Sequence, residues 1–265
     1  MVISPDEANP MTFSKERLQT LLPGRPLRYY STVGSSNDMA MFWLREGAPA
    51  GAVVLADEQT AGRGRKGRLW YTPPGVALAV SYILRPQPEQ LNRIAMMGAV
   101  AVVELCQHFG AAEVGIKWPN DVQIADKKIC GILPEAAWDG PDLQGVVLGI
   151  GVNIRVNLPD ELRNIATNLE DAISQPIDRA QAAAYLIQRL DNWSQQLSSL
   201  QLFDRWRHHL TTVGKTVRVE DVVGVVESVD ESGALIIRTS IGSTERVIAG
   251  DVMIDPTSDD RSDAS

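Results

Sequence analysis

The pattern of hydrophobic and polar positions predicts alternating strands and helices from residue 14 to residue 210. Short apolar runs typical of buried strands lie at 27–33, 51–56, 76–84, 114–118, 122–125, 129–133 and 143–154, with a turn at 126–128. Helical patterns lie at 14–22, 38–45, 91–109, 179–200 and 203–210. The helix at 91–109 is apolar nearly all round over 95–103, so we expect it to pack against the sheet.

After Gly214 the pattern changes to short β-branched segments separated by turns, at 216–219, 222–229, 234–239, 244–248 and 252–254. A stretch of about 45 residues of this kind predicts a small β-barrel. We therefore expect an α/β (α+β) fold, in which a mixed β-sheet with helices packed on one side occupies residues 27–212 and the barrel occupies residues 213–256. Residues 1–26 are expected to form a partly disordered leader, and residues 257–265 a disordered acidic tail.

Composition narrows the class of protein. The 265 residues carry a formal net charge of -8, which argues against broad nonspecific binding of nucleic acid. Two cysteines, Cys106 and Cys130, provide no disulfide framework and fit a cytoplasmic setting. The N-terminus lacks the pattern of a signal peptide, and no run approaches the roughly 18 apolar residues of a membrane span. We expect a cytoplasmic protein that does not bind membranes.

Against this acidic background, residues 59–70 form a basic stretch, Gln-Thr-Ala-Gly-Arg-Gly-Arg-Lys-Gly-Arg-Leu-Trp. Its four cations alternate with three glycines; the cations are Arg63, Arg65, Lys66 and Arg68, and the glycines are Gly62, Gly64 and Gly67. Glycine lets backbone N–H groups converge on an anion, and the cations supply positive charge. The stretch therefore predicts a binding site for phosphate or for nucleic acid.

Two phosphate-binding fingerprints do not fit this stretch. Its glycines have the Gly-x-Gly-x-x-Gly spacing of dinucleotide-binding folds, but Pro73-Pro74 follows where that fingerprint requires a helix. The Walker pattern also fails, because Gly67 is followed by Arg68-Leu69 and not by Lys-Ser/Thr. A nuclear-localisation or RNA-binding patch explains the cations but neither the interleaved glycines nor the acidic remainder.

Four weaker motifs accompany the basic stretch: Ser35-Ser36-Asn37, Lys117-Trp118-Pro119-Asn120-Asp121, Lys128-x-x-Gly131-Ile132-Leu133-x-Glu135 and Gly149-x-Gly151-x-Asn153. Each has an ordinary structural explanation: a helix cap, an Asx turn, an exposed hairpin lysine and a bulged strand. For the first motif the helix cap is the favoured explanation on its own, and a polar clamp for a ligand at a helix N-terminus is the alternative. Their joint occurrence in this order is far more specific than any one of them.

Together with the basic stretch, these motifs resemble biotin protein ligases, from about residue 29 to the last barrel strand. The resemblance implies the biotin/lipoate ligase catalytic fold followed by a small C-terminal SH3-like β-barrel, which agrees with the pattern above. Repressor members of that family carry an additional N-terminal winged-helix domain, and residues 1–26 are too short for one. We therefore expect the short monofunctional form, with no DNA-binding activity, as a monomer or homodimer.

The resemblance implies a two-step reaction. The biotin carboxylate attacks the α-phosphate of ATP to give biotinyl-5′-AMP and pyrophosphate, and a lysine of the biotin carboxyl carrier protein of acetyl-CoA carboxylase then displaces AMP. Because the first step joins two anions, cations and Mg²⁺ must offset their repulsion. No protein nucleophile is needed, and none is evident around the three histidines, His108, His208 and His209.

The resemblance also assigns roles to residues. The expected catalytic residues are Lys128, Arg65 and Arg63. The expected biotin-binding residues are Ser35, Ser36, Asn37, Gln59, Gly62, Arg63, Gly64, Arg65, Lys128, Gly131, Gly149 and Gly151. The expected ATP and adenylate residues are Arg63, Arg65, Arg68, Trp70, Lys117, Asn120, Asp121 and Asn153, with Asp121 as the Mg²⁺ ligand. For Trp70, a role as a core anchor of the loop remains an equal alternative. The glycine-rich loop is expected to be mobile until ligand closes it.

Two departures from the family pattern are mild: Ser36 stands where threonine is common, and Pro134 precedes Glu135. Three rival functions stay open. A lipoate–protein ligase shares the adenylation chemistry but usually shows an Arg-Arg-x-Ser-Gly-Gly-Gly stretch, which this chain lacks. A nucleic-acid-binding module would use the basic stretch together with the barrel. A scaffold that binds biotin without turnover is disfavoured by the presence of Lys128, Arg63 and Arg65.

Overall fold

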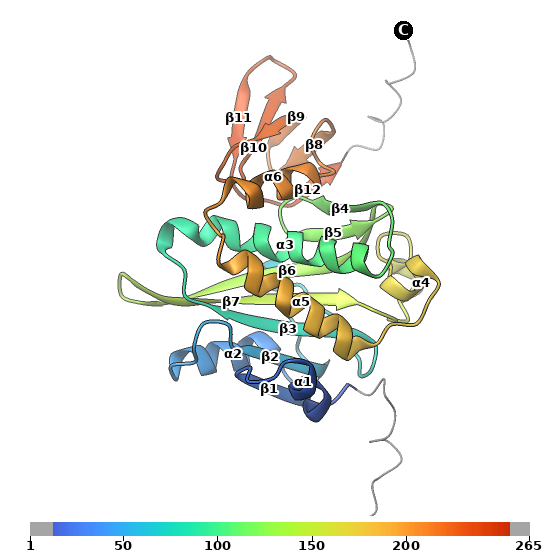
Figure 1. Ribbon diagram of the computed structural model, residues 1–265. Coiled ribbons are helices and arrows are strands. Elements are labelled where there is room, and N and C mark those ends of the chain that lie inside the picture. Colours follow the sequence, from blue (N-terminus) through green and yellow to red (C-terminus); the bar gives the residue numbers. More distant parts are fainter. Residues whose placement is uncertain (1–12, 255–265) are drawn as a thin grey trace, which may run out of the picture.

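The computed structural model describes residues 13–254 and contains two β-sheets (Figure 1). The seven-stranded sheet has the order β1-β2-β3-β7-β6-β5-β4, and the five-stranded sheet has the order β11-β10-β9-β8-β12. Within these residues, no helix is both long and apolar enough to cross a membrane. The predicted disorder of the leader before residue 11 and of the acidic tail after residue 256 falls outside the described residues.

The large sheet is mixed, because β1 pairs with β2 in parallel and the other neighbouring strands pair antiparallel. Its strands are β1 (Leu27–Val33), β2 (Val53–Gln59), β3 (Ala77–Leu84), β4 (Val114–Lys117), β5 (Asp121–Ile124), β6 (Lys127–Asp139) and β7 (Asp142–Asn153). The helices are α1 (Lys15–Leu21), α2 (Ser36–Arg45), α3 (Leu91–His108), α4 (Leu169–Ile173), α5 (Arg179–Ser194) and α6 (Leu200–His208). Short 3₁₀ turns lie at Arg65–Gly67, Pro88–Gln90 and Asp160–Leu162.

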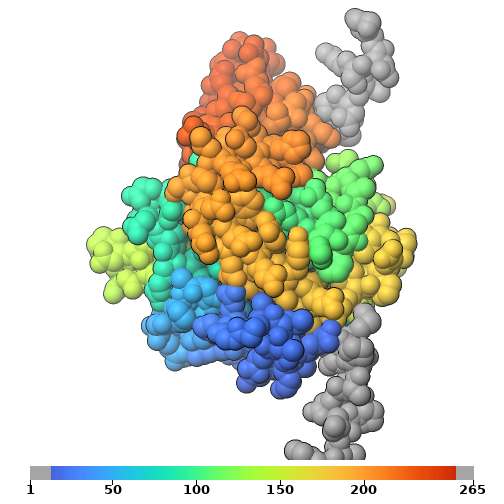
Figure 2. All heavy atoms as spheres, in the orientation of Figure 1, coloured from blue at the N-terminus to red at the C-terminus, as the bar shows by residue number. Residues whose placement is uncertain are grey.

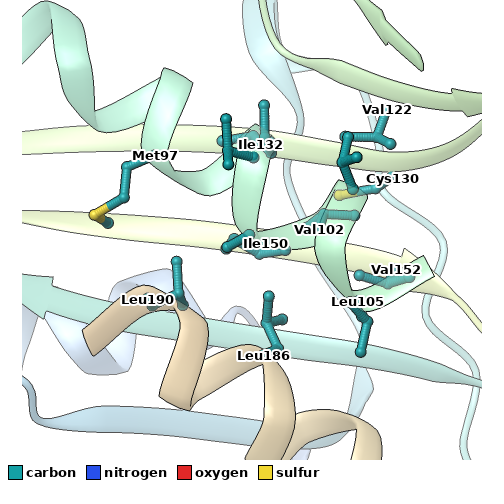
Figure 3. Close-up of a cluster of buried hydrophobic side chains, with 14 of the residues drawn as sticks. Met97, Val102, Leu105, Val122, Cys130, Ile132, Ile150, Val152, Leu186 and Leu190 are labelled. Atoms are coloured by element: carbon teal, nitrogen blue, oxygen red, sulfur yellow. The ribbon is translucent and has the colours of Figure 1, made fainter. Parts of the chain in front are cut away.

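Alternation along β7 explains why the sheet has two different faces. Val146, Leu148, Ile150 and Val152 join the main core, whereas Val147 joins a smaller cluster on the opposite face. Figure 3 shows the main core, with side chains of α3 and α5 over those of β6 and β7. The expected packing of the long helices on one face is confirmed. The short helix α2 instead packs on the other face, where Ala40 and Leu44 meet the smaller cluster.

Sequence patterns placed most elements within a few residues, and the differences are informative. The predicted turn at 126–128 is wrong: the turn is Ala125-Asp126, with φ of 47° and 62°, and Lys128 already lies in β6. The strand β6 continues to Asp139, well past the predicted end at residue 133, because it pairs with β7 from Cys130 to Asp139. The predicted helix 179–200 ends at Ser194, and α4 was not predicted.

The small sheet is antiparallel throughout and fits the expected barrel-like module (Figure 2, orange to red). Its strands are β8 (Thr216–Val219), β9 (Val222–Val229), β10 (Leu235–Thr239), β11 (Thr244–Val247) and β12 (Val252–Ile254). The segment leading into it continues the large sheet: the Ile116 N–H donates to the His209 carbonyl (2.7 Å), and the Thr211 N–H donates to the Ile116 carbonyl (3.0 Å). The domain boundary expected between residues 212 and 213 stays a prediction.

Candidate functional site

The site lies on the face of the large sheet opposite α3 and α5, and small residues form its floor. Across β3, β7 and β6, Ala79, Gly151 and Gly131 lie side by side. Because these residues have little or no side chain, they leave a hollow where larger residues would fill the surface. A cavity of about 610 Å³ occupies this hollow, which is a size suited to a small-molecule ligand.

All of the site residues expected from the sequence line this cavity, with the exception of Gly62. Gly62 lies at the base of the basic loop, where a Cβ atom would come within 2.5 Å of the Trp70 carbonyl oxygen. Its missing side chain therefore permits the loop to close on itself, and the Trp70 N–H donates to the Gly62 carbonyl (2.8 Å).

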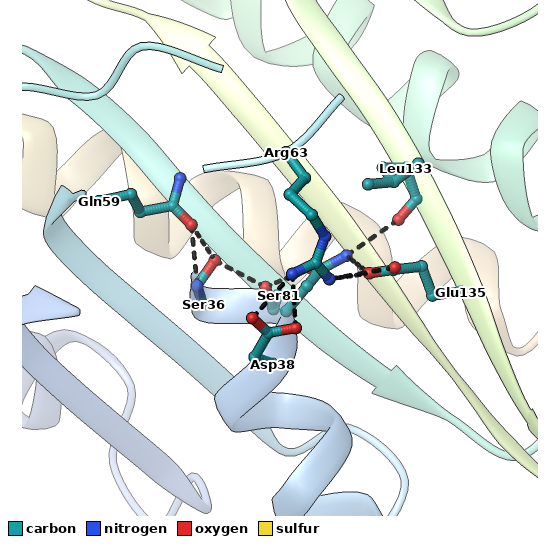
Figure 4. Close-up of polar contacts among 8 residues, drawn as sticks. Ser36, Asp38, Gln59, Arg63, Ser81, Leu133 and Glu135 are labelled. Atoms are coloured by element: carbon teal, nitrogen blue, oxygen red, sulfur yellow. Dashed lines mark hydrogen bonds and ion pairs between the residues drawn. The ribbon is translucent and has the colours of Figure 1, made fainter. Parts of the chain in front are cut away.

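At one end of the cavity, the first turn of α2 carries a cluster of buried polar groups (Figure 4). Ser35 occupies the N-cap position but makes no capping hydrogen bond through its side chain. The Gln59 Oε1 atom accepts from the Ser36 N–H (2.8 Å) and from the Ser36 hydroxyl (3.0 Å). Asn37 donates through Nδ2 to Glu135 Oε2 (2.6 Å). The polar side chains at the start of α2 are therefore not used to cap the helix, and those of Ser36 and Asn37 instead bond to β2 and β6 at this end of the cavity.

Arg63 is held by two carboxylates. Its guanidinium lies 2.6 Å from Asp38 Oδ1 and 3.1 Å from Glu135 Oε1 (Figure 4). The hydrogen bond to Asp38, with further support from Glu135, raises the pKa of Arg63 in spite of partial burial. Asp38 and Glu135 thus join the basic loop to α2 and to β6. Neither residue was singled out as a ligand contact from the sequence.

The remaining cations of the loop point toward the C-terminal module. Arg65 Nη1 donates to Asn120 Oδ1 (3.1 Å) and to the Gly250 carbonyl (3.4 Å). Arg68 lies 3.1 Å and Lys66 3.6 Å from the Asp251 carboxylate. Lys66 adopts a left-handed conformation, with φ of 55°, which lets the loop turn sharply at this point. The predicted mobility of this loop stays a prediction.

Lys128 lies beside the glycines of the floor, with its Cε atom 3.6 Å from the position that a Cβ atom on Gly131 would take. Its Nζ atom lies 2.8 Å from Asp121 Oδ1 and 5.6 Å from the centre of a Trp70 ring. Backbone hydrogen bonds fix its position, since the Lys128 N–H donates to the Ile165 carbonyl (2.8 Å) and its carbonyl accepts from the Thr167 N–H (2.9 Å). The side chain is about one-third exposed (33%), so the ammonium group is accessible from the cavity.

Trp70 covers the glycines of the floor. A Cβ atom on Gly151 would lie 2.3 Å from Trp70 Nε1, and one on Gly131 would lie 3.1 Å from the same ring system. The indole N–H is buried and has no hydrogen-bond acceptor among the described residues. Trp70 therefore packs on the floor and forms part of the cavity wall, and its role toward the adenylate stays a prediction.

A second wall was missed by sequence reasoning. The segment between β7 and α4 lines the other end of the cavity with mostly apolar side chains, namely Val156, Leu158, Pro159, Leu162, Ile165 and Ala166. Two of them, Leu162 and Ile165, are 37% and 62% exposed. The sequence did contain an indication of this wall. Apolar residues recur along a segment that is otherwise polar, and such a pattern indicates an apolar patch and not an ordinary solvent-exposed loop.

The cavity offers one carboxylate suited to Mg²⁺. Within residues 13–254, no three histidine, cysteine or acidic side chains gather as a metal site. Mg²⁺ at nucleotide sites usually keeps several waters and takes one or two carboxylates together with substrate phosphates. The Asp121 carboxylate, which lines the cavity beside Lys128, fits one such position.

Comparison with known proteins identifies the family. Residues 30–153 match the biotin/lipoate A/B protein ligase family, and residues 212–254 match the biotin protein ligase C-terminal domain. The biotin–[acetyl-CoA-carboxylase] ligase of Paracoccus denitrificans is 34% identical over 216 residues, covering 75% of this chain and 89% of that protein. The chain belongs to the biotin protein ligase family.

Two further members of the biotin protein ligase family resemble this chain, one in sequence and one in fold. The Mycobacterium tuberculosis biotin–[acetyl-CoA-carboxylase] ligase is 33% identical over 245 residues, covering 86% of this chain and 89% of that protein. The Aquifex aeolicus biotin protein ligase, solved in complex with biotin and ATP, superposes with a TM-score of 0.75 at 24% identity over 86% of this chain and 98% of that one. That likeness confirms the fold expected from the motifs. The match to the C-terminal domain favours the biotin ligases over the lipoate ligases.

Proposed function

We propose that this chain activates biotin with ATP and transfers the biotinyl group to a lysine of a carrier protein. The observation that carries the proposal is one cavity with two chemically different regions. Neutral hydrogen-bonding groups of Ser36, Asn37 and Gln59 lie at the first turn of α2, and the cations Lys128 and Arg65 lie farther along the same cavity. Such a cavity suits a neutral ring followed by a carboxylate and a phosphate.

The cations have an electrostatic task in the first step. Attack of the biotin carboxylate on the α-phosphate brings two anions together, and Lys128 and Arg65 offset their repulsion. Charge on the attacked phosphate grows in the transition state, so a fixed ammonium group nearby stabilises that state more than the ground state. The Asp121 carboxylate orients Lys128 through its 2.8 Å contact.

The nucleotide is proposed to extend between Asn120, Asn153 and the apolar wall at 156–166, all of which line the cavity. Mg²⁺, when bound with ATP, neutralises phosphate charge, and Asp121 is the carboxylate proposed to contact it. Trp70 and the basic loop exclude water from the mixed anhydride, which would otherwise hydrolyse. In the second step, the carrier lysine attacks the acyl carbon and AMP leaves.

The acceptor is proposed to be the biotin carboxyl carrier protein of acetyl-CoA carboxylase, since two relatives are named as ligases for that enzyme. A cytoplasmic location is also proposed. It is supported by two cysteines that are both buried and unpaired with each other. The oligomeric state is proposed as monomer or homodimer.

The test is ATP-dependent transfer of biotin to a purified carrier domain, with lipoate run in parallel and the mass of the carrier measured in both reactions, because an avidin blot detects only the biotin product. We expect labelling that requires ATP and Mg²⁺ and is absent with lipoate. Labelling with lipoate alone would assign the chain to the other acyl substrate. Absence of both labelling and biotin-dependent pyrophosphate release would contradict the proposal and favour the nucleic-acid-binding alternative, which a salt-dependent gel shift would then test.

A further inference from the structure

Arg179, the first residue of α5, is a charged side chain buried behind the cavity, with 4% of the residue exposed. Charged groups are seldom buried unless they are paired, and its partner is Asp57 on β2, with Nη2 2.6 Å from Oδ1. Asp57 continues the alternating row of Val53 and Leu55, which face the main core. The ion pair therefore lies on the face of the large sheet opposite the cavity, and neither partner lines the cavity.

This ion pair holds both ends of the basic loop. The loop leaves the sheet at the end of β2 and returns to it at the start of β3, which is Ala77. Asp57 Oδ1 also accepts from the Gly75 N–H (3.1 Å), and Arg179 donates through Nε (3.0 Å) and Nη2 (2.8 Å) to the Ala77 carbonyl. We call Asp57, Gly75 and Ala77 the loop root. A planar guanidinium group has enough donors to bond to the carboxylate and to the carbonyl at the same time.

Beyond its root, the basic loop is bonded to itself. The Gln59 N–H donates to the Thr72 carbonyl (3.0 Å), and farther out the Gly64 N–H donates to the Arg68 carbonyl (2.7 Å). These antiparallel contacts make the loop a narrow hairpin, so its direction over the cavity is set where it is attached. Its ion pairs with Asp251 are exposed and individually weak. The buried contacts of the root are shielded from solvent and from salt.

The apolar wall at 156–166 begins at the same place. The Ile154 N–H (3.1 Å) and the Arg155 N–H (2.8 Å) both donate to the Val76 carbonyl, one residue before Ala77. The wall therefore leaves the end of β7 at the point where the basic loop re-enters the sheet. Two walls of the cavity thus start from neighbouring residues, and Arg179 supports that point from the core side.

We propose that Arg179 is a positioning residue that fixes the loop root and so holds the basic loop and the apolar wall closed over the mixed anhydride. The inference rests on the proposed function, which supplies the anhydride that the loop protects. A buried ion pair adds little net stability compared with apolar residues of the same volume, so we assign it a geometric role. Without it, water reaches the acyl carbon, AMP leaves, and biotin and a proton are released with no transfer to the carrier.

The test measures how tightly ATP use is coupled to biotin transfer in full-length Arg179→Met. Without a carrier, biotin-dependent formation of AMP should rise roughly tenfold over the unmodified chain, the effect of losing one hydrogen bond to a charged group. With the carrier present, more than one pyrophosphate should be released for each biotinyl group transferred. A second readout needs no activity: trypsin should cut the loop faster at residues 63–68 in the absence of ligand.

Two further variants separate positioning from loss of stability. Arg189→Met removes another arginine of the same helix, whose ion pair with Glu104 on α3 (2.6 Å) does not involve the loop root, so it should keep the coupling and the cleavage rate of the unmodified chain. Asp57→Asn keeps the size of the side chain and an oxygen for the Gly75 N–H but removes the charge that faces Arg179. It should uncouple in the same direction as Arg179→Met, and it decides the matter if that variant does not fold.

The results that would overturn the inference are distinguishable from failure of the proposed function. If the unmodified chain releases no pyrophosphate with biotin and ATP, the proposed function fails and the inference fails with it. If it does, but Arg179→Met and Asp57→Asn keep its coupling and its cleavage rate, the inference is wrong while the proposed function stands. Equal uncoupling by Arg189→Met would also overturn the inference, because the effect would then be one of general destabilisation.

Discussion

Individual residues at this site act by their charge or by the absence of a side chain. Lys128 brings an ammonium group to the floor of the cavity, and Gly131, Gly149 and Gly151 leave the floor open. The buried thiol of Cys130 lies next to Gly131 but on the core side of β6, where burial raises its pKa well above the usual value. It is therefore unsuited to act as a nucleophile at neutral pH, which agrees with a reaction that needs none.

Replacing Lys128 with alanine should lower biotin-dependent pyrophosphate release by two or more orders of magnitude. Its ammonium group is proposed to offset the repulsion between two anions in a partly enclosed site. The ion pair with Asp121 is about one-third exposed on the lysine side (33%), so its loss should cost at most ~1 kcal/mol of stability. Lys127→Ala, at the adjacent exposed position, is the matched control. Near-normal release by Lys128→Ala in a folded protein would remove this residue from the mechanism.

A methyl group on the floor should weaken biotin binding. In Gly151→Ala the new Cβ atom meets Trp70 Nε1 at 2.3 Å, so the indole must move into or away from the cavity. We expect a loss of roughly 5- to 150-fold in biotin affinity, corresponding to about 1–3 kcal/mol of steric strain. Gly34→Ala provides the control, because its Cβ would meet nothing within 4 Å. Calorimetric titration measures the biotin affinity of both variants, and equal affinities would contradict the role given to Gly151.

At the scale of elements, the basic loop connects the large sheet to the C-terminal module. One end is attached through Arg63 to α2 and β6, and the other through Lys66 and Arg68 to Asp251, just before β12. All of these ion pairs are at least partly exposed, so each is individually weak and sensitive to salt. Together they hold the loop over the cavity.

Removing the charge of Asp251 should loosen one end of the loop. For Asp251→Asn we expect a few-fold faster tryptic cleavage after Arg65, Lys66 and Arg68 in the absence of ligand, as expected for the loss of weak, exposed ion pairs. The difference should shrink in about 1 M salt, where the screening length falls to roughly 3 Å. Asp221→Asn, on the turn between β8 and β9, controls for a general effect on the module. Identical cleavage of both variants at low salt would show that Asp251 does not hold the loop.

At the scale of the whole molecule, the two sheets are joined by specific contacts. The segment after α6 adds a short parallel bridge, Ile116 to Leu210, to the edge strand β4. Trp118 then reaches the small sheet, where its indole N–H donates to the Gly233 carbonyl (2.8 Å). Covering the edge strand removes unpaired backbone groups from solvent. The C-terminal module is thus part of the folded body that also positions Asp251 and Gly250 at the site.

Trp118→Phe should therefore destabilise the whole chain and not the module alone. The variant leaves the Gly233 carbonyl without its donor and shrinks a side chain that is 3% exposed. We expect a cost of roughly 1–3 kcal/mol and a melting temperature lower by several degrees, still in a single transition. Trp138→Phe, at a tryptophan that is 49% exposed, should melt like the parent protein. Two separate transitions in scanning calorimetry would contradict this coupling.

Sequence patterns predicted most of the fold, because the apolar periodicity of a strand or helix and the residue that caps it lie within the element itself. Alternating or continuous apolar runs defined β1, β8, β9 and β12 to the residue. The predicted helix at 14–22 is also present as α1, and the Ser14 side chain caps it by accepting from the Arg17 N–H. The errors fall where pairing outweighs local preference. The polar start of β6 at Lys127-Lys128 suggested a turn, but hydrogen bonds to β5 and to the segment at 165–167 keep it extended.

The sequence by itself determined the family, the order of the elements and the residues proposed to act on biotin and ATP, because these depend on residue identity and spacing along the chain. Only the tertiary structure brought in Asp38, Asp251 and the wall at 156–166, and only it gave Glu135 its partners Asn37 and Arg63. These groups act through contacts between segments far apart in the sequence, such as Asn37 with Glu135 and Arg68 with Asp251. An acid such as Asp251 carries no local signal, because its partners Lys66 and Arg68 lie on a loop far away along the chain.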